Sequence, residues 1–236
     1  MSIHTWQMVQ GHPIVTIDGV RALVDTGSPS SFGNRERLTV AGTVHQLQRN
    51  QLGLSVDAIA AMAGIEFDVL LGTDVLRQTP FHIRRTGRLE FGAAGPADPS
   101  LSRIDLAECM GVPVATADVA GRPVRVVVDT GAQLGYLPPD VIAPYPVVDE
   151  VEDFYPAFGK FETEVREVPL TLGAQEYVLR FGSLPTMLAL ALGLMGAEGI
   201  VGSELLALRD WWFDLGGKED AETGSIRAGM GLLAEV

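Results

Sequence analysis

The sequence predicts an all-β protein built of two similar lobes, and three observations carry this prediction. An apolar strand that ends in Asp-Thr-Gly occurs twice, as ALVDTG at 22–27 and VVVDTG at 126–131. Each copy is followed, after a variable middle, by two apolar residues and a glycine, LLG at 70–72 and IVG at 200–202. Glycine and proline punctuate short apolar runs along the chain, which is typical of strands joined by tight turns. An internal repeat of this size indicates two related lobes.

The first element of each half is a hairpin that leads into the Asp-Thr-Gly motif. PIVTIDGVRALVDTG turns at Asp18-Gly19, and VATADVAGRPVRVVVDTG turns at Ala120-Gly121. Each motif aspartate therefore ends a buried strand, just before a glycine that lets the chain bend sharply. A charge in such a place costs free energy unless it is compensated or used.

The later elements also repeat. DVLLGTDVLRQTPFHI (68–83) aligns with GIVGSELLALRDWWF (199–213), and both read as a strand, a helical turn and a closing strand. PFHIRRTGRLEFG then predicts a terminal hairpin that turns at Thr86-Gly87. The next residues are rich in Gly, Ala, Pro and Ser, so we expect lobes at 1–92 and 105–236 joined by a linker at 93–104.

Composition excludes several classes of partner. The net charge of −13 argues against a nucleic acid or an anionic membrane, because both attract clustered Lys and Arg. The longest apolar run, 187–197, is about half the length that spans a bilayer. The lone Cys109 excludes an internal disulfide, and the first residues show no basic start before an apolar stretch. We therefore expect a cytoplasmic protein.

Motifs for cofactors, metals and covalent catalysis are missing. The four histidines have no metal-ligand spacing, and no GxGxxG, phosphate-binding loop or GxSxG elbow occurs. Cys109 reads as a small buried hydrophobic residue rather than a nucleophile. We expect neither a cofactor nor a metal.

The doubled pattern resembles the aspartic proteases of the pepsin and retropepsin type. In that family each lobe gives one aspartate to a shared site at the lobe interface, and pepsins do so on one duplicated chain. The resemblance spans nearly the whole sequence and implies a bilobal acid-protease fold with pseudo-twofold symmetry. It implies an endopeptidase that works as a monomer on a peptide or protein substrate.

The resemblance assigns the catalytic roles to Asp25 and Asp129, which would share one proton and activate a water molecule. The threonines Thr26 and Thr130 are expected to hydrogen bond across the interface. Gly27 and Gly131 should bring backbone N–H groups close to the carboxylates. Ser28 follows the first motif and Ala132 the second.

Because only Ser28 carries a hydroxyl, we expect that hydroxyl to donate to Asp25. Asp25 would then hold more of the negative charge, and Asp129 more of the proton.

Substrate closure is expected from the second lobe, which has about 26 more residues between its two motifs. EDFYPAFGKFETEV predicts an exposed hairpin with a Phe158-Gly159 turn, and Tyr155 and Phe158 are the residues expected to cover a bound peptide. The alternative is that these aromatics pack on their own lobe. In the first half RLTVAGTVHQLQRN offers only a short hairpin, and the tyrosine-glycine flap of pepsins is absent.

Three other functional interpretations stay open. A pseudoprotease would keep the cleft and bind extended peptides without cleaving them, and the thin first-lobe flap favours this reading. The two aspartates could also simply cap local turns. Phosphoryl transfer through an aspartate is disfavoured because the surrounding motifs of those enzymes are missing.

Overall fold

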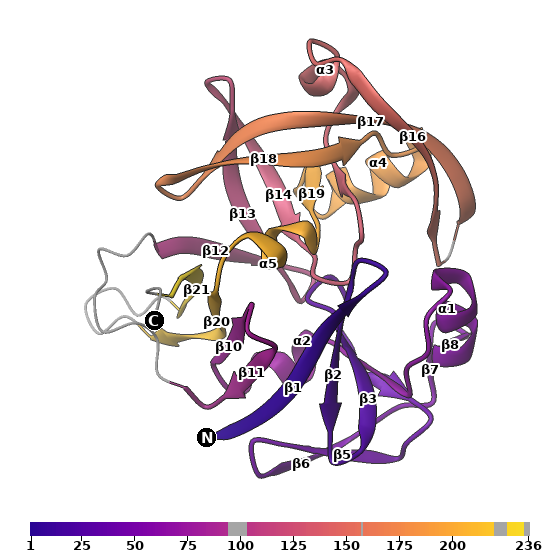
Figure 1. The fold of residues 1–236 in the computed structure, drawn as a ribbon, viewed down its shortest axis with the longest axis vertical. Helices are drawn as coiled ribbons and strands as arrows, with labels where there is room; N and C mark the ends of the chain where they lie inside the picture. Colours follow the sequence, from indigo (N-terminus) through magenta and orange to yellow (C-terminus); the bar gives the residue numbers. More distant parts are fainter. Residues whose placement is uncertain (94–102, 157, 220–225, 234–236) are drawn as a thin grey trace.

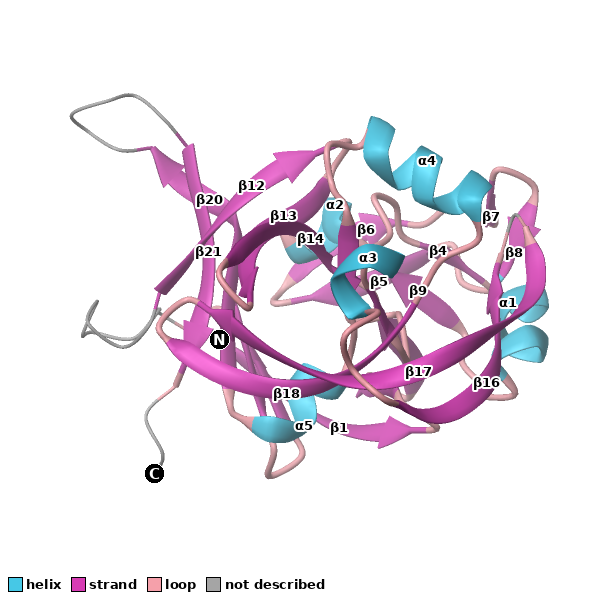
Figure 2. Ribbon diagram, turned by 90° about the horizontal axis from the view of Figure 1, so that it is seen from above, coloured by secondary structure: helices cyan, strands magenta, loops and turns pink. Residues whose placement is uncertain are grey.

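The computed structural model describes residues 1–93, 103–156, 158–219 and 226–233. Residues 94–102 of the expected linker therefore lie outside the described residues. The chain is mostly β and forms two lobes (Figure 1), with short helices at the surface (Figure 2). This is the bilobal architecture that the repeat predicts.

We call β1 to β11 the first half and β12 to β21 the second half. The elements of the first half are β1 Ser2–Val9, β2 His12–Ile17, β3 Val20–Val24, β4 Phe32–Gly33, β5 Arg37–Val40, β6 Thr43–Gln46, β7 Asn50–Gln51, β8 Leu54–Ser55, α1 Val56–Ala63, β9 Val69–Leu71, α2 Thr73–Leu76, β10 Phe81–Arg84 and β11 Arg88–Phe91. Those of the second half are β12 Arg103–Cys109, β13 Val112–Val119, β14 Arg122–Val128, β15 Gly135–Tyr136, α3 Pro139–Ile142, β16 Val147–Tyr155, β17 Gly159–Leu172, β18 Gln175–Gly182, α4 Thr186–Leu194, β19 Gly199–Val201, α5 Glu204–Leu208, β20 Trp211–Glu219 and β21 Ile226–Leu232.

The predicted hairpins form with the predicted turns. β2 pairs with β3 around Asp18-Gly19, and β13 pairs with β14 around Ala120-Gly121. Both residues of each turn have positive φ, at 49° and 78° in the first turn and 52° and 84° in the second. This geometry matches the right-handed twist of the flanking strands, which is why a glycine stands second in each turn.

The two halves use the same strand order around the motif. β3 runs parallel to β9, and β14 runs parallel to β19. The short strand after each motif then pairs antiparallel to the same partner, β4 with β9 and β15 with β19. The apolar residues of LLG and IVG thus lie beside the strands that carry the aspartates.

A continuous sheet joins the halves. The closing strands β10 and β20 pair antiparallel, which sets Phe81 opposite Phe213 and Ile83 opposite Trp211. The Phe81 and Phe213 rings are stacked with centroids 4.9 Å apart, and all four side chains are fully buried. Burial of such large apolar side chains contributes about 1.5–3 kcal/mol each, so this seam is a main link between the halves.

Candidate active site

The two motif aspartates lie where the parallel strand pairs end. The Asp25 amide donates to the Leu71 carbonyl of β9 at 2.9 Å, and the Asp129 amide donates to the Val201 carbonyl of β19 at 3.0 Å. These bonds continue the parallel pairing of β3 with β9 and of β14 with β19 by one residue beyond the ends of β3 and β14. Both side chains then enter the same cleft between the halves.

Each carboxylate is held by its own motif loop. The Oδ1 of Asp25 accepts hydrogen bonds from the amides of Gly27 and Ser28, at 2.9 and 3.0 Å. The second loop repeats this arrangement at Asp129 Oδ1 with amides at 2.9 and 3.1 Å, donated by Gly131 and Ala132. Backbone donors need no side-chain ordering, so the carboxylates are fixed by the fold itself.

The motif threonines cross the interface, as the sequence predicts. The Thr26 amide donates to Thr130 Oγ1 at 3.1 Å, and the Thr130 amide donates to Thr26 Oγ1 at 3.0 Å. Each hydroxyl in turn donates at 2.6 Å to a carbonyl of the opposite half, on Val128 and Val24. Both threonines are buried, so this reciprocal network fixes one motif loop against the other.

The motif glycines are required by the approach of the opposite carboxylate. A Cβ placed on Gly27 would lie 2.2 Å from the Asp129 carboxyl carbon. A Cβ on Gly131 would lie 2.5 Å from the Asp25 carboxyl carbon. No side chain fits at either position without separating the carboxyl groups.

Asp25 and Asp129 form a dyad, a pair of carboxyl groups close enough to share one proton. Burial raises the pKa of Asp25 well above its ordinary value, and the charge of Asp129 raises it further. Burial also raises the pKa of Asp129, while the backbone amides that hold it act in the opposite direction. Each carboxyl group lies against the motif loop of the other, and two carboxyl groups this close cannot both ionise without a large electrostatic cost.

The expected role of the Ser28 hydroxyl is wrong. Ser28 Oγ donates to the Ser30 carbonyl at 2.9 Å and lies 3.3 Å from Gln51 Oε1, whereas Asp25 receives the Ser28 amide. The backbone donors are therefore equivalent in the two loops, although only one loop has a hydroxyl. Burial raises the pKa of both aspartates, and which of them holds more of the shared proton stays a prediction.

The cleft above the dyad has a volume of about 250 Å³ and two apolar walls. The first half supplies Leu23, Phe32, Leu54, Ile59 and Leu70. The second half supplies Tyr136, Phe161, Leu184 and Ile200. A cleft of this kind suits a bound ligand with apolar groups on either side of the dyad.

The expected hairpin of the second half is present, but its two aromatic residues lie differently. β16 and β17 pair up to Tyr155 and Gly159, and Gly159 has φ of 96°. Tyr155 lines the cleft, and its pKa is raised by burial and then by the charges of Asp129 and Asp25. Phe158 is 47% exposed and does not line the cleft, so neither expectation, covering the dyad or packing in its own lobe, describes it.

The first half contributes a hairpin to the cleft lining that the sequence analysis did not predict. The expected hairpin forms as β5 and β6, yet it contributes nothing to the cleft lining. The following hairpin of β7 and β8 contributes Gln51, Leu52 and Leu54, and Leu52 at its tip is 93% exposed. Figures 1 and 2 both show the end of the β16–β17 hairpin beside α1 and β8. The turn residues Leu52-Gly53 were the available sequence signal.

Two polar groups near the dyad also escaped the sequence analysis. His12, the first residue of β2, is buried and lines the cleft, with its Nδ1 2.9 Å from the Gly131 carbonyl oxygen. The Tyr136 hydroxyl donates a short hydrogen bond to Asp153 of β16. Burial raises the pKa of Tyr136, so it stays protonated as the donor.

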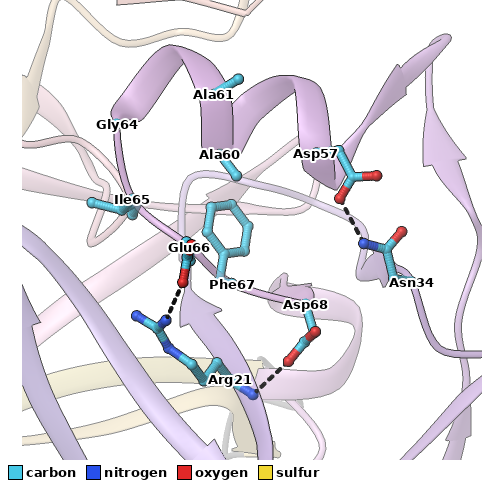
Figure 3. Close-up of a pocket in the computed structure, with 10 residues that line it drawn as sticks. All are labelled: Arg21, Asn34, Asp57, Ala60, Ala61, Gly64, Ile65, Glu66, Phe67 and Asp68. Atoms are coloured by element: carbon cyan, nitrogen blue, oxygen red, sulfur yellow. Dashed lines mark hydrogen bonds and ion pairs between the residues drawn. The ribbon is translucent and has the colours of Figure 1, made fainter.

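A more open depression lies away from the dyad, where α1 returns to β9 (Figure 3). Its polar side chains are paired with one another. Arg21 contacts Glu66 at 3.4 Å, its amide donates to Asp68 at 3.1 Å, and Asn34 donates to Asp57 at 2.6 Å. These contacts tie the loop after α1 to β3 and account for the polar lining.

The described ranges also bear on a metal site and on a membrane span. Within them, no three His, Cys, Asp or Glu side chains are grouped so as to hold a metal ion. No helix in the described part of the chain is long and apolar enough to cross a membrane.

Comparisons with known proteins support the fold. No protein-family model matches the sequence, and no curated protein matches it. The crystal structure of an aspartic proteinase from Irpex lacteus matches with a TM-score of 0.53 over 98% of this chain and 97% of that chain, at 12% identity. The simian foamy virus protease matches 39% of this chain and 88% of its own, with a TM-score of 0.29 and 10% identity. The first of these shows that the chain has the bilobal fold of a pepsin-like aspartic proteinase.

Proposed function

We propose that the protein is an aspartic endopeptidase that hydrolyses peptide bonds at the Asp25–Asp129 dyad. One observation carries the proposal. Two half-buried carboxyl groups lie against each other's motif loops at the floor of a cleft between the halves, and each has one oxygen fixed by two backbone amides. Structural pairs of carboxylates are costly to bury, so such a pair in a cleft is a functional-site candidate.

The chemistry follows from the single shared proton. A water molecule bound between the carboxyl groups loses a proton to the ionised carboxylate as its oxygen attacks the scissile carbonyl carbon. The protonated carboxyl donates its proton to the carbonyl oxygen, which gives a neutral tetrahedral diol. The nitrogen then takes the proton held by the first carboxyl as the C–N bond breaks, and the diol returns the other proton to the dyad. No covalent intermediate with the protein is needed.

The cleft indicates an extended peptide as substrate. Apolar walls on both sides of the dyad suit large apolar side chains on either side of the scissile bond. The two hairpins, β7–β8 and β16–β17, contribute to the cleft lining from opposite halves. Closure of both over a bound peptide would exclude water other than the nucleophile.

A peptide-binding pseudoprotease is the alternative. The first-half hairpin that reaches the cleft has strands of only two residues each, which favours weak closure and hence binding without turnover. Intact carboxyl, threonine and glycine positions in both loops favour catalysis.

The experiment that tests the proposal is digestion of a peptide library from pH 3 to pH 8, with and without a statine-type inhibitor. We expect inhibitor-sensitive cleavage between large apolar residues, lost as pH rises past the point at which the dyad gives up its shared proton. Inhibitor-sensitive peptide binding without cleavage at any pH would support the pseudoprotease. The absence of both binding and cleavage would overturn both proposals.

A further inference from the structure

His12 breaks an otherwise close repeat around the dyad. The turn Gly11-His12-Pro13 corresponds to Gly111-Val112-Pro113 in the second half. Both glycines have positive φ, at 78° and 90°. Their carbonyls are bound in matching ways, by the Ser203 hydroxyl at Gly11 and by Thr73 Oγ1, at 2.6 Å, at Gly111. The residue after the turn is a histidine in one half and an apolar valine in the other.

The histidine contacts the loop that holds Asp129. Its Nδ1 lies 2.9 Å from the Gly131 carbonyl oxygen, and since a carbonyl only accepts, Nδ1 carries the hydrogen. The peptide unit that contains this carbonyl also contains the Ala132 amide, which donates to Asp129 Oδ1 at 3.1 Å. Hydrogen bonds at the two ends of one peptide unit strengthen each other. His12 therefore makes the Ala132 amide a better donor to a carboxylate.

The first half has no equivalent of this donor. There the matching peptide unit joins Gly27 and Ser28, and the Ser28 amide donates to Asp25 Oδ1 at 3.0 Å. Val112, at the place that corresponds to His12, has no polar atom to offer the Gly27 carbonyl. The two carboxyl groups thus sit in loops with matching backbone donors, and a histidine contacts only the loop of Asp129.

We propose, on the basis of the endopeptidase function above, that His12 is a positioning residue that makes Asp129 the water-activating carboxylate and Asp25 the proton donor. The charge pattern agrees. Burial raises the pKa of both carboxyl groups. The charge of a protonated His12 counteracts this at Asp129, whereas the charge of Asp129 adds to it at Asp25. The titratable groups that share the cleft with His12 are Asp25 after β3, Asp129 after β14, Tyr136 on β15, and Asp153 and Tyr155 on β16.

Protonation of His12 would strengthen the effect. Burial lowers the pKa of His12, while the Gly131 carbonyl and the charges of Asp153 and Asp129 raise it. In the acid range a charged imidazole favours the ionised Asp129 and keeps the dyad singly protonated to lower pH. The acid limb of the pH–rate profile should therefore depend on His12.

Two substitutions separate the effect of the His12 Nδ1–H donor from the effect of the imidazole charge. His12→Val copies the residue of the second half and removes both. His12→Asn places an amide N–H near the position of Nδ1 and removes only the charge. For His12→Val we expect the acid limb to move up by about 0.5–1 pH unit and kcat to fall about tenfold, with KM nearly unchanged. For His12→Asn we expect most of kcat to return while the acid limb stays shifted.

Two kinetic results would overturn the inference. One is an unchanged pH profile in His12→Val, whatever happens to kcat, because that result indicates a packing role. The other is a kcat in His12→Asn no higher than in His12→Val. The melting temperature of each variant is measured alongside, so that the kinetics compare folded proteins.

A nuclear magnetic resonance titration of the His12 ring nitrogens tests the coupling without any cleavage, and so separates its failure from failure of the endopeptidase proposal. We expect hydrogen on Nδ1 at neutral pH, and a His12 pKa that falls more in Asp129→Asn than in the matched control Asp25→Asn. Hydrogen on Nε2, or equal shifts in the two variants, would overturn the inference.

Discussion

The motif glycines exclude side chains for a reason that can be measured. An added methyl group at residue 131 would lie 2.5 Å from the Asp25 carboxyl carbon, and backbone on both sides is fixed by the dyad hydrogen bonds. We expect Gly131→Ala to reduce kcat/KM at least 100-fold, since a displacement of about 1 Å at the reacting groups has effects of that size. Peptide-cleavage kinetics measure the loss. Gly193→Ala is the matched control, because a Cβ on Gly193 of α4 meets nothing within 4 Å. A fully active Gly131→Ala would contradict the geometry described here.

The dyad should cost stability at neutral pH. Burial raises the folded-state pKa of Asp25 above its unfolded value near 3.9, so the folded chain binds the proton more tightly than the unfolded chain does. Wild-type stability is therefore lost as pH rises from about 4 through the folded-state pKa. Asp25→Asn keeps an acceptor for the two backbone amides but carries no charge.

Melting temperatures of Asp25→Asn and wild type at pH 3 and pH 7.5 test this prediction. We expect the variant to melt about 3 °C or more above wild type at pH 7.5, given that each kcal/mol shifts a chain of this size by about 2–4 °C. At pH 3 the gap should be small. A variant that melts below wild type at pH 7.5 would show that the carboxylate stabilises the fold instead.

Two hairpins from opposite halves line the cleft, β7–β8 and β16–β17. Tyr155 of the β16–β17 hairpin lines the cleft, whereas Phe158 at the turn does not, although both side chains are about half exposed. We expect Tyr155→Ala to lower kcat/KM tenfold or more with little change in melting temperature, because it excludes water from the dyad. Phe158→Ala is the matched control and should have a smaller effect. Peptide-cleavage kinetics of both variants measure the two losses in kcat/KM. A larger loss in Phe158→Ala than in Tyr155→Ala would support Phe158 as the residue that covers the peptide.

Elements with strong periodicity could be predicted from the sequence, and very short ones could not. The hairpins before each motif have four or more alternating residues and a glycine turn, so strand, turn and partner follow from local chemistry. The hairpin β7–β8 has two residues per strand, too few to show a period. The placement of Asp25, Asp129 and the threonines followed from the repeat, whereas His12 contacts a loop 119 residues away and gave no signal.

At the scale of the whole molecule, both half-sites lie on one chain, so activity should not depend on a second copy. The antiparallel pairing of β10 with β20 and the burial of Phe81 and Phe213 also hold the halves together. We predict a monomer whose specific activity is constant on dilution from micromolar to low nanomolar protein. Specific activity that falls on dilution, with a matching change in sedimentation, would instead show a site built between chains.

The central claim is that Asp25 and Asp129 act as one proton-sharing unit. The most direct test compares peptide cleavage by Asp25→Asn and Asp129→Asn with that of wild type, on protein shown to be folded by its circular dichroism and melting transition. Each variant replaces one of two carboxyl groups that lie against each other's motif loops. The account predicts that each single variant loses at least 1,000-fold in kcat and that the double variant loses little more, as expected of residues that act as a unit. Near-wild-type cleavage by either folded single variant would contradict it.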